Sequence, residues 1–116
     1  MKKILVVDDE ENIRMLYQEE LQEEGYEVAV ASNGIEAIEV LSTAPFDLVT
    51  LDIRMPGMDG INTVRAIKEK YRDLAVVLVT AYGEYKQDFS TWASDAYVVK
   101  SADLTELKAT VKRIIG

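Results

Sequence analysis

Residues 49–60 read VTLDIRMPGMDG and place an acid, Asp52, where a buried apolar run meets a Pro-Gly turn. Residues 48–51 just before the acid carry no charge, which is typical of a strand covered on both faces. A lone carboxylate after such a strand is most often only the first polar residue of a loop. Asp52 therefore gains meaning from what the rest of the chain places beside it.

Short apolar runs of the same kind recur along the chain. They lie at residues 4–7, 75–79 and 97–99, and the more mixed run 27–31 suits a sheet edge. Between these runs, apolar residues recur at helical spacing: Ile13, Leu16, Tyr17 and Leu21; Ile35, Ile38 and Leu41; Val64, Ile67 and Tyr71; Leu104, Leu107, Val111 and Ile114. Strands alternating with helices predict a parallel sheet with right-handed crossovers and helices on both faces.

Residues at the ends of the expected helices support this alternation. Gly25 suits the end of the first helix, because glycine readily adopts the left-handed conformation found there. Asn33 with Glu36 suits the start of the second helix, and Asp103 with Glu106 forms a capping-box pattern for the last. The elements predicted from hydrophobic spacing therefore have matching start and stop signals.

The composition limits the classes of function. With 116 residues, 48% of them hydrophobic, the chain fits one compact domain over residues 1–116. The absence of Cys and His excludes disulfides, thiolate or histidine zinc sites and catalytic triads that need histidine. A net charge of -8 without a basic cluster argues against direct binding of nucleic acid. No apolar run suits a membrane span, so we expect a soluble intracellular protein.

Polar residues follow the predicted strands, and the ligand crevice of a parallel sheet lies at the carboxyl ends of its strands. Asp8 and Asp9 follow the first strand, Asp52 the third, Thr80 the fourth and Lys100 the fifth. Carboxylates about 5 Å apart repel by about 3 kcal/mol per pair at an effective dielectric of about 20, so protons or a cation must offset them. Oxygen ligands of this kind suit Mg²⁺, and the sequence holds no calcium-binding loop motif.

A metal-supported aspartate can act as a nucleophile toward a phosphoryl group and form an acyl phosphate. The phosphoryl oxygens then need partners. The metal can bind one, the hydroxyl of Thr80 can donate to a second, and the ammonium of Lys100 can pair with a third. Each residue alone is more often structural: Thr80 as a strand residue, Lys100 on the surface, and Asp8 and Asp9 as a helix cap. Their gathering on one predicted rim favours the functional interpretation.

Four motifs make the chain resemble the receiver domains of bacterial two-component response regulators, including the chemotaxis regulators. These motifs are ILVVDDE, LDIRMPGMDG, VTAYGE and DAYVVK, in the order found in the family, and the resemblance covers essentially the whole chain. It implies a flavodoxin-like, doubly wound α/β fold with a five-stranded parallel sheet of order 2-1-3-4-5.

The resemblance also implies a role for each matching residue. Asp52 is expected to be the phosphoacceptor and, with Asp8, Asp9 and the backbone carbonyl of Arg54, to hold Mg²⁺. Thr80 is expected to be the switch hydroxyl, and Lys100 the amine that binds the phosphoryl group. The expected aromatic switch residue, whose rotamer reports phosphorylation, is Tyr97.

The implied function is a cytoplasmic signalling switch rather than an enzyme. It would accept a phosphoryl group from a sensor histidine kinase or a histidine phosphotransfer protein, and at most label itself from small phosphodonors and slowly lose the label. Output would pass to a downstream protein target or a C-terminal output domain, without nucleic acid or membrane contact, and a homodimer is compatible. Two alternatives stay open: a receiver-like interaction module that works without phosphorylation, and a Mg²⁺-dependent phosphatase with an Asp nucleophile.

Two departures from the family pattern fall before and after the last strand. Ser101 stands where receivers usually have a proline after the lysine, and a cis bond before a non-proline residue costs roughly 2.5 to 4 kcal/mol. The stretch between Thr80 and Lys100 is shorter than usual, and bulky Trp92 replaces a small residue. Trp92 is expected either to cover the core or to belong to a partner-binding surface.

Overall fold

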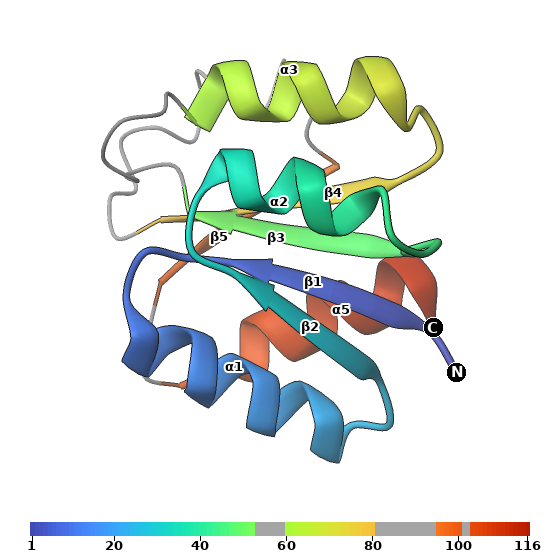
Figure 1. Ribbon diagram of the computed structural model, residues 1–116. Helices are drawn as coiled ribbons and strands as arrows, with labels where there is room; N and C mark the ends of the chain where they lie inside the picture. Colours follow the sequence, from blue (N-terminus) through green and yellow to red (C-terminus); the bar gives the residue numbers. More distant parts are fainter. Residues whose placement is uncertain (53–59, 81–94, 101–102) are drawn as a thin grey trace.

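The computed structural model describes residues 1–52, 60–80, 95–100 and 103–116, and there a helix follows each strand except β4 (Figure 1). The strands are β1 (Lys3–Val7), β2 (Glu27–Ala31), β3 (Leu48–Asp52), β4 (Ala75–Thr80) and β5 (Ala96–Val99). The helices are α1 (Glu11–Glu23), α2 (Gly34–Leu41), α3 (Gly60–Lys70) and α5 (Thr105–Ile115). Several predicted features lie outside the described residues, namely Arg54, Trp92, Ser101 and the expected helix before Tyr97. The side chains of residues 60–62 and 80 also lie outside the described part of the chain.

The strands form one parallel sheet in the order β2-β1-β3-β4-β5, which confirms the predicted fold class. In the register of the sheet, Val7 of β1 lies beside Ala31 of β2 on one side and Leu51 of β3 on the other. All residues of β3 are buried, whereas β2 and β5 contain exposed positions. The mixed composition of residues 27–31 thus matches their place at one edge of the sheet.

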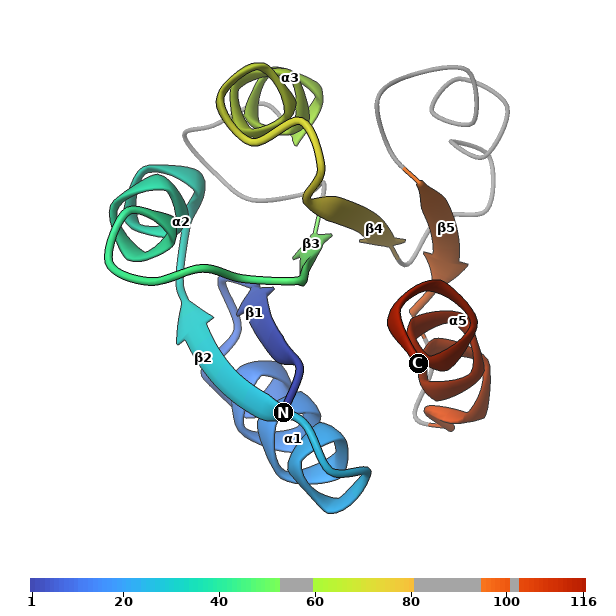
Figure 2. The ribbon, with the colours of Figure 1, turned by 90° about the vertical axis from the view of Figure 1, so that its right-hand side faces the viewer.

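The sheet separates two hydrophobic layers (Figure 2). One layer packs α1 and α5 against the sheet, through residues such as Tyr17 and Val111. The other layer packs α2 and α3 against the opposite face, through residues such as Leu41 and Ile67. Because successive strand side chains point to opposite faces, every unbroken apolar strand can supply both layers.

The end of α1 is fixed by Gly25, as the sequence predicts. Gly25 has a φ of 95°, a conformation in which a side chain is unfavourable. Its N–H donates to the carbonyl of Gln22 at 3.0 Å, and the N–H of Tyr26 donates to that of Leu21 at 3.2 Å. This pair of hydrogen bonds is the Schellman motif, and Tyr26 and Leu21 also share the same hydrophobic layer.

The starts of α2 and α5 differ in how well the sequence predicts them. Asn33 caps α2, because its Oδ1 accepts the N–H of Glu36 at 2.8 Å. Helix α5 begins later than the capping-box pattern indicates, with Leu104 rather than Asp103 in the N-cap position. Asp103 Oδ1 accepts from both the backbone N–H and the hydroxyl of Thr105, at 2.9 and 2.6 Å.

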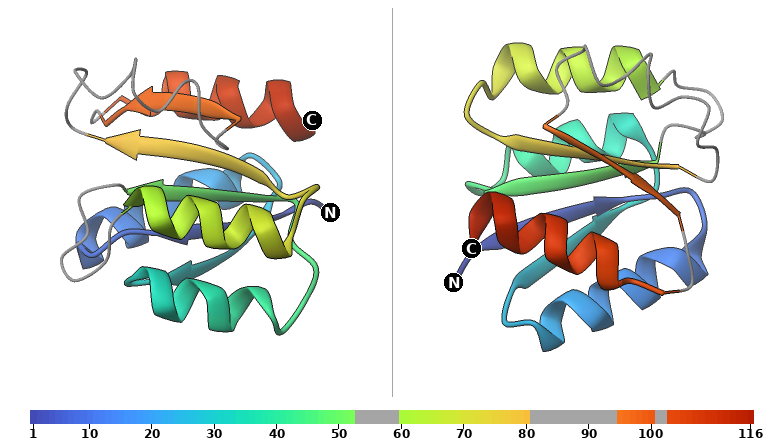
Figure 3. Two further views of the ribbon diagram at one scale, coloured as in Figure 1. Left: turned by 90° about the horizontal axis from the view of Figure 1, so that it is seen from above. Right: turned by 180° about the vertical axis from the view of Figure 1, so that it is seen from behind.

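Both chain ends lie at the amino ends of the strands (Figure 3). Met1, Lys2 and Gly116 line one shallow hollow there. The carboxyl ends of the strands point to the opposite side of the molecule (Figure 3). Among the helices of the described part of the chain, none combines the length and apolar character that a bilayer crossing needs.

Candidate functional site

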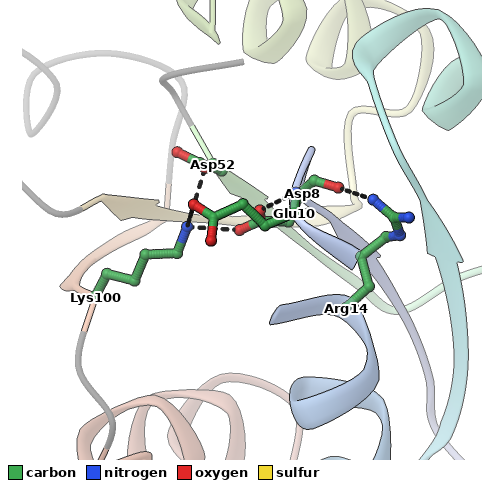
Figure 4. Close-up of polar contacts among 5 residues, drawn as sticks. All are labelled: Asp8, Glu10, Arg14, Asp52 and Lys100. Atoms are coloured by element: carbon green, nitrogen blue, oxygen red, sulfur yellow. Dashed lines mark hydrogen bonds and ion pairs between the residues drawn. The ribbon is translucent and has the colours of Figure 1, made fainter. Parts of the chain in front are cut away.

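The carboxyl ends of β1, β3 and β5 bring three charged residues together (Figure 4). Asp8 directly follows β1, Asp52 is the last residue of β3, and Lys100 directly follows β5. The neighbours of both acids, Val7 and Leu51, are partners in the sheet register. Because the strands are parallel, residues far apart in sequence share one edge of the sheet.

Lys100 lies between the two buried carboxylates. Its Nζ is 2.8 Å from Asp8 Oδ2 and 3.1 Å from Asp52 Oδ2, and it is 3.9 Å from Glu10 Oε1. The side chains of Asp8 and Asp52 are only 3% and 1% exposed, and that of Lys100 is 12% exposed. Charges removed from water in this way need close partners of opposite sign. The ammonium therefore acts as an internal counter-ion for both acids.

Burial and charge compete in setting the pKa values of this group. Burial raises the pKa of Asp8, and the charge of Asp52 adds to that rise, against the lowering effect of Lys100 and of the Glu10 N–H. Burial acts to lower the pKa of Lys100, but the hydrogen bonds and charges of Asp8 and Asp52 outweigh it and raise that pKa. Lys100 therefore keeps its proton throughout the physiological range.

Every polar atom of Asp8 has a partner. Its N–H donates to the carbonyl of Ala31 at 3.1 Å, and its Oδ1 accepts the N–H of Glu10 at 2.9 Å. Its carbonyl oxygen accepts from Nη1 of Arg14 at 2.7 Å, and its Oδ2 faces Lys100 (Figure 4). The carboxylate of Asp8 is thus oriented by the N–H of Glu10 and by Lys100, and contacts from β2 and α1 hold its backbone.

Three successive acids form a group suited to a hard cation. Carboxylate oxygens of Asp8, Asp9 and Glu10 lie within 4.8 Å of one another, and the last two side chains are exposed. An all-oxygen set of this kind, with room for water on its exposed side, is the chemistry that Mg²⁺ prefers. Lys100 pairs with Asp8 and lies 3.9 Å from Glu10, so it offsets only part of the negative charge of this group. The residues present therefore fit a divalent cation.

The other predicted site residues are only partly described. Arg54 lies outside the described residues, and the hydroxyl of Thr80 does so as well, although the backbone of Thr80 ends β4 beside Val99 of β5. Tyr97 lies on β5, is half-buried, and packs against the hydrophobic layer of α2 and α3. The roles expected of these three residues stay predictions.

The sequence did not indicate that three further residues, Glu10, Arg14 and Tyr17, lie near the site. Glu10 directly follows the predicted metal acids, and that position was the available signal. Arg14 is a basic residue near the start of an otherwise acidic helix. Tyr17 was expected only as a core residue. It is buried, burial raises its pKa to about 12, and the charges of Lys100, Asp8 and Asp52 also act on it.

Comparison with known proteins decides the family. The family model of the response regulator receiver domain matches residues 4–112 of this chain. This chain belongs to the response regulator receiver family. Sporulation initiation phosphotransferase F of Bacillus subtilis is a relative that is 35% identical over 116 residues, which cover 98% of this receiver and 94% of that protein.

Solved structures of other receivers have the same fold. The response regulator TrrA of Thermotoga maritima, in complex with Mg²⁺-BeF, is 52% identical, with a TM-score of 0.93 over 99% of this chain and 100% of that one. TrrA has also been solved in complex with the histidine kinase ThkA, with a TM-score of 0.91 and 100% coverage of both chains. The chemotaxis protein CheY4 of Vibrio cholerae is 32% identical, with a TM-score of 0.91 and 99% coverage of each chain.

Some relatives are longer than this receiver. The transcriptional regulatory protein ResD of Bacillus subtilis is 41% identical over 97% of this chain, which spans 48% of ResD. The regulatory protein AtoC of Escherichia coli is 35% identical over 99% of this chain, which spans 25% of AtoC. The receiver fold thus occurs both in proteins of about this length and as one part of larger regulators.

Proposed function

We propose that residues 1–116 form one receiver domain that accepts a phosphoryl group on Asp52 from a histidine kinase or a histidine phosphotransfer protein. The observation that carries the proposal is the position of Asp52, buried at the end of β3 and 3.1 Å from the ammonium of Lys100. A buried carboxylate with a cation beside it is poised to receive a dianionic group. The crystal structures of TrrA with Mg²⁺-BeF and with the kinase ThkA support the same chemistry for this chain.

In the proposed step, a carboxylate oxygen of Asp52 attacks the phosphorus of a phosphohistidine. The new O–P bond forms an acyl phosphate, and the N–P bond breaks with its electron pair returning to the imidazole of the donor protein. The donor histidine must lie outside residues 1–116, because this sequence contains no histidine. Lys100 lies close enough to Asp52 for its ammonium to pair with an oxygen of the incoming group.

A divalent cation fits the same edge of the sheet. Asp8, Asp9 and Asp52 would hold Mg²⁺, with the carbonyl of Arg54 as implied by the family resemblance. The metal would supply positive charge that offsets the phosphoryl oxygens and the crowded acids. Two buried carboxylates face one ammonium in this structure, so Lys100 alone leaves a net negative charge at the site. That surplus favours uptake of a cation.

Output is proposed to follow from a population shift. Phosphorylated Asp52 would attract the hydroxyl of Thr80, and Tyr97 would turn toward the space that opens, favouring an arrangement that the protein already samples. The changed surface would lie around residues 82 to 106. The longer relatives ResD and AtoC suggest that the recipient is either a separate protein or a further domain of the same polypeptide. Spontaneous loss of phosphate would be slow, as suits a switch.

The test is covalent labelling of the purified chain by acetyl phosphate or phosphoramidate with Mg²⁺, followed by intact-mass measurement. Wild type is expected to gain one phosphoryl group, and Asp52→Asn is expected to gain none, because an amide is not a nucleophile of this kind. Equal labelling of both proteins would show that Asp52 is not the acceptor. A wild type that neither labels nor changes its NMR spectrum with Mg²⁺ and beryllofluoride would point instead to a phosphorylation-independent interaction module.

A further inference from the structure

Arg14 holds the turn that carries the predicted metal acids. It is the fourth residue of α1, and its Nη1 donates to the carbonyl of Asp8 at 2.7 Å (Figure 4). Its backbone N–H donates to the carbonyl of Glu10 at 3.1 Å. The second bond is the first backbone bond of α1 and does not depend on the side chain, so the guanidinium contributes the contact with Asp8.

The position of Arg14 is not explained by helix stability alone. The amino end of a helix carries partial positive charge, so acids are favoured there and a cation gains nothing from the dipole. The remaining charged residues of α1, namely Glu11, Glu19, Glu20 and Glu23, are acids. Arg14 is half-buried and reaches back over the turn instead of extending into solvent. Its hydrogen bond to Asp8 is charge-assisted, which makes it stronger than a neutral one.

The other contacts of Asp8 depend on the same backbone geometry. Its Oδ1 is held by the N–H of Glu10, so a turn that opens would release the carboxylate as well as the carbonyl. In this turn the carboxylate oxygens of Asp8, Asp9 and Glu10 lie within 4.8 Å of one another. By holding the carbonyl of Asp8, the guanidinium of Arg14 therefore helps to keep the three carboxylates together.

We propose that Arg14 is a positioning residue that raises the affinity of the Asp8–Glu10 turn for a divalent cation, without contacting the cation or the phosphoryl group. The inference rests on the proposed function, because it takes this turn to be part of the metal site. Outer partners that orient metal ligands typically change affinity by about 10- to 100-fold when removed. Since Arg14 acts on the backbone, we expect an effect near the lower end, about 10-fold.

Charge and positioning predict opposite results, which makes the proposal testable. A positive side chain near the site repels a cation, so loss of charge alone would tighten Mg²⁺ binding. Loss of positioning would weaken it. The measurement is the Mg²⁺ dissociation constant of the whole chain by isothermal titration calorimetry, for wild type and for Arg14→Met. We expect about 10-fold weaker binding by Arg14→Met, and binding as tight as wild type or tighter would overturn the proposal.

Lys108→Met is the matched control. Lys108 of α5 also contacts α1, with its Nζ 2.7 Å from Glu20 Oε1, and its removal changes the net charge by the same amount. We expect it to bind Mg²⁺ as wild type does. A loss equal to that of Arg14→Met would assign the effect to general loosening of α1 and overturn the proposal.

Labelling by acetyl phosphate gives a second readout that a general structural role would not produce. Arg14→Met is expected to need more Mg²⁺ for half-maximal labelling but to approach the wild-type rate at saturating Mg²⁺, because Arg14 does not touch the phosphoryl group. A lower rate at saturation with unchanged Mg²⁺ dependence would contradict the positioning role.

Arg14→Lys is the second variant, in case Arg14→Met does not fold in a thermal melt without metal. It keeps the charge but shortens the reach of the donor, and it is expected to bind Mg²⁺ more weakly than wild type. Binding equal to wild type would show that the hydrogen bond from Nη1 to the carbonyl of Asp8 does not set the affinity, and would overturn the proposal. If wild type itself binds no Mg²⁺, the proposed function fails. If wild type binds Mg²⁺ and the Arg14 variants bind it equally tightly, this inference alone fails.

Discussion

Lys100 and Asp52 are 48 positions apart in the chain, yet the Nζ of Lys100 lies 3.1 Å from Oδ2 of Asp52. The same ammonium is 2.8 Å from Oδ2 of Asp8. The site therefore holds a positive charge of its own at the place where a metal ion and a phosphoryl group are proposed to bind. Either ligand must change the contacts of Lys100 with the two acids.

Replacing Lys100 by Met should destabilise the metal-free protein, because two buried carboxylates lose their counter-ion. Removing one partner of a buried pair costs about 3 kcal/mol or more. Urea denaturation at neutral pH without divalent metal measures the change, and added Mg²⁺ should restore part of the loss.

Lys68→Met is the control for this loss of stability. Lys68 also pairs at 2.8 Å, but its partner Asp95 is 40% exposed, so the loss should be about 1 kcal/mol or less. Equal destabilisation by the two variants would contradict the role of Lys100 as a buried counter-ion.

The same Lys100→Met variant should separate metal binding from phosphoryl transfer. At pH 8 it should bind Mg²⁺ more tightly, because the ammonium no longer competes for the two carboxylates. Its labelling by phosphoramidate at saturating Mg²⁺ should be slower by about 100-fold, since removal of one preorganised partner of a developing charge costs about that much. Calorimetry and timed mass spectrometry measure the two effects. A variant that labels at the wild-type rate would remove Lys100 from the proposed step.

Tyr17 should make the stability fall at alkaline pH. Burial raises the pKa of its phenol from 10.0 to about 12, so the unfolded chain loses this proton first as the pH rises. Between these values the folded state binds more protons, and stability decreases with pH by about 2 kcal/mol in total. Urea denaturation of wild type and Tyr17→Phe between pH 9 and 12 isolates the contribution of this phenol to the free energy of unfolding. The two proteins should diverge above about pH 10, and parallel curves would contradict the burial of this phenol.

Gly25→Ala should destabilise the fold by about 1 kcal/mol through the backbone alone. An added Cβ at this position meets no atom within 4 Å, so crowding does not contribute, but the φ of 95° is unfavourable for alanine. Gly25→Asn should lose less, because asparagine tolerates positive φ better. Thermal melts of both variants provide the comparison. Similar losses for Ala and Asn would mean that the Schellman turn is not the cause.

The arrangement of the sheet was predictable because local pattern and topology agree. Unbroken apolar runs such as residues 4–7 and 48–51 are typical of strands that are buried on both faces of a sheet. Parallel pairing then brings the carboxyl ends of these strands together. The positions of Asp8 and Asp52 on one edge follow from that rule. The edge position of residues 27–31 follows from their mixed composition.

The details of the site were not predictable in the same way. The position of Lys100 between Asp8 and Asp52 depends on side-chain conformations, which no spacing rule specifies. The contact of Arg14 with the carbonyl of Asp8 depends on how α1 leaves β1. The start of α5 at Thr105 depends on hydrogen bonds of Asp103 that compete with the capping-box arrangement. In each case, tertiary contacts choose among options that are locally similar.

The location of Met1 and Gly116 beside one hollow, on the side away from the acids, has a practical use. A fluorophore, an affinity tag or a surface linker attached at either end would leave the entrance to Asp52 unobstructed. Immobilised protein could therefore be probed with phosphodonors and metal ions from the open side. Joining the two ends through a designed connector would also give a circularly permuted switch with new ends placed elsewhere.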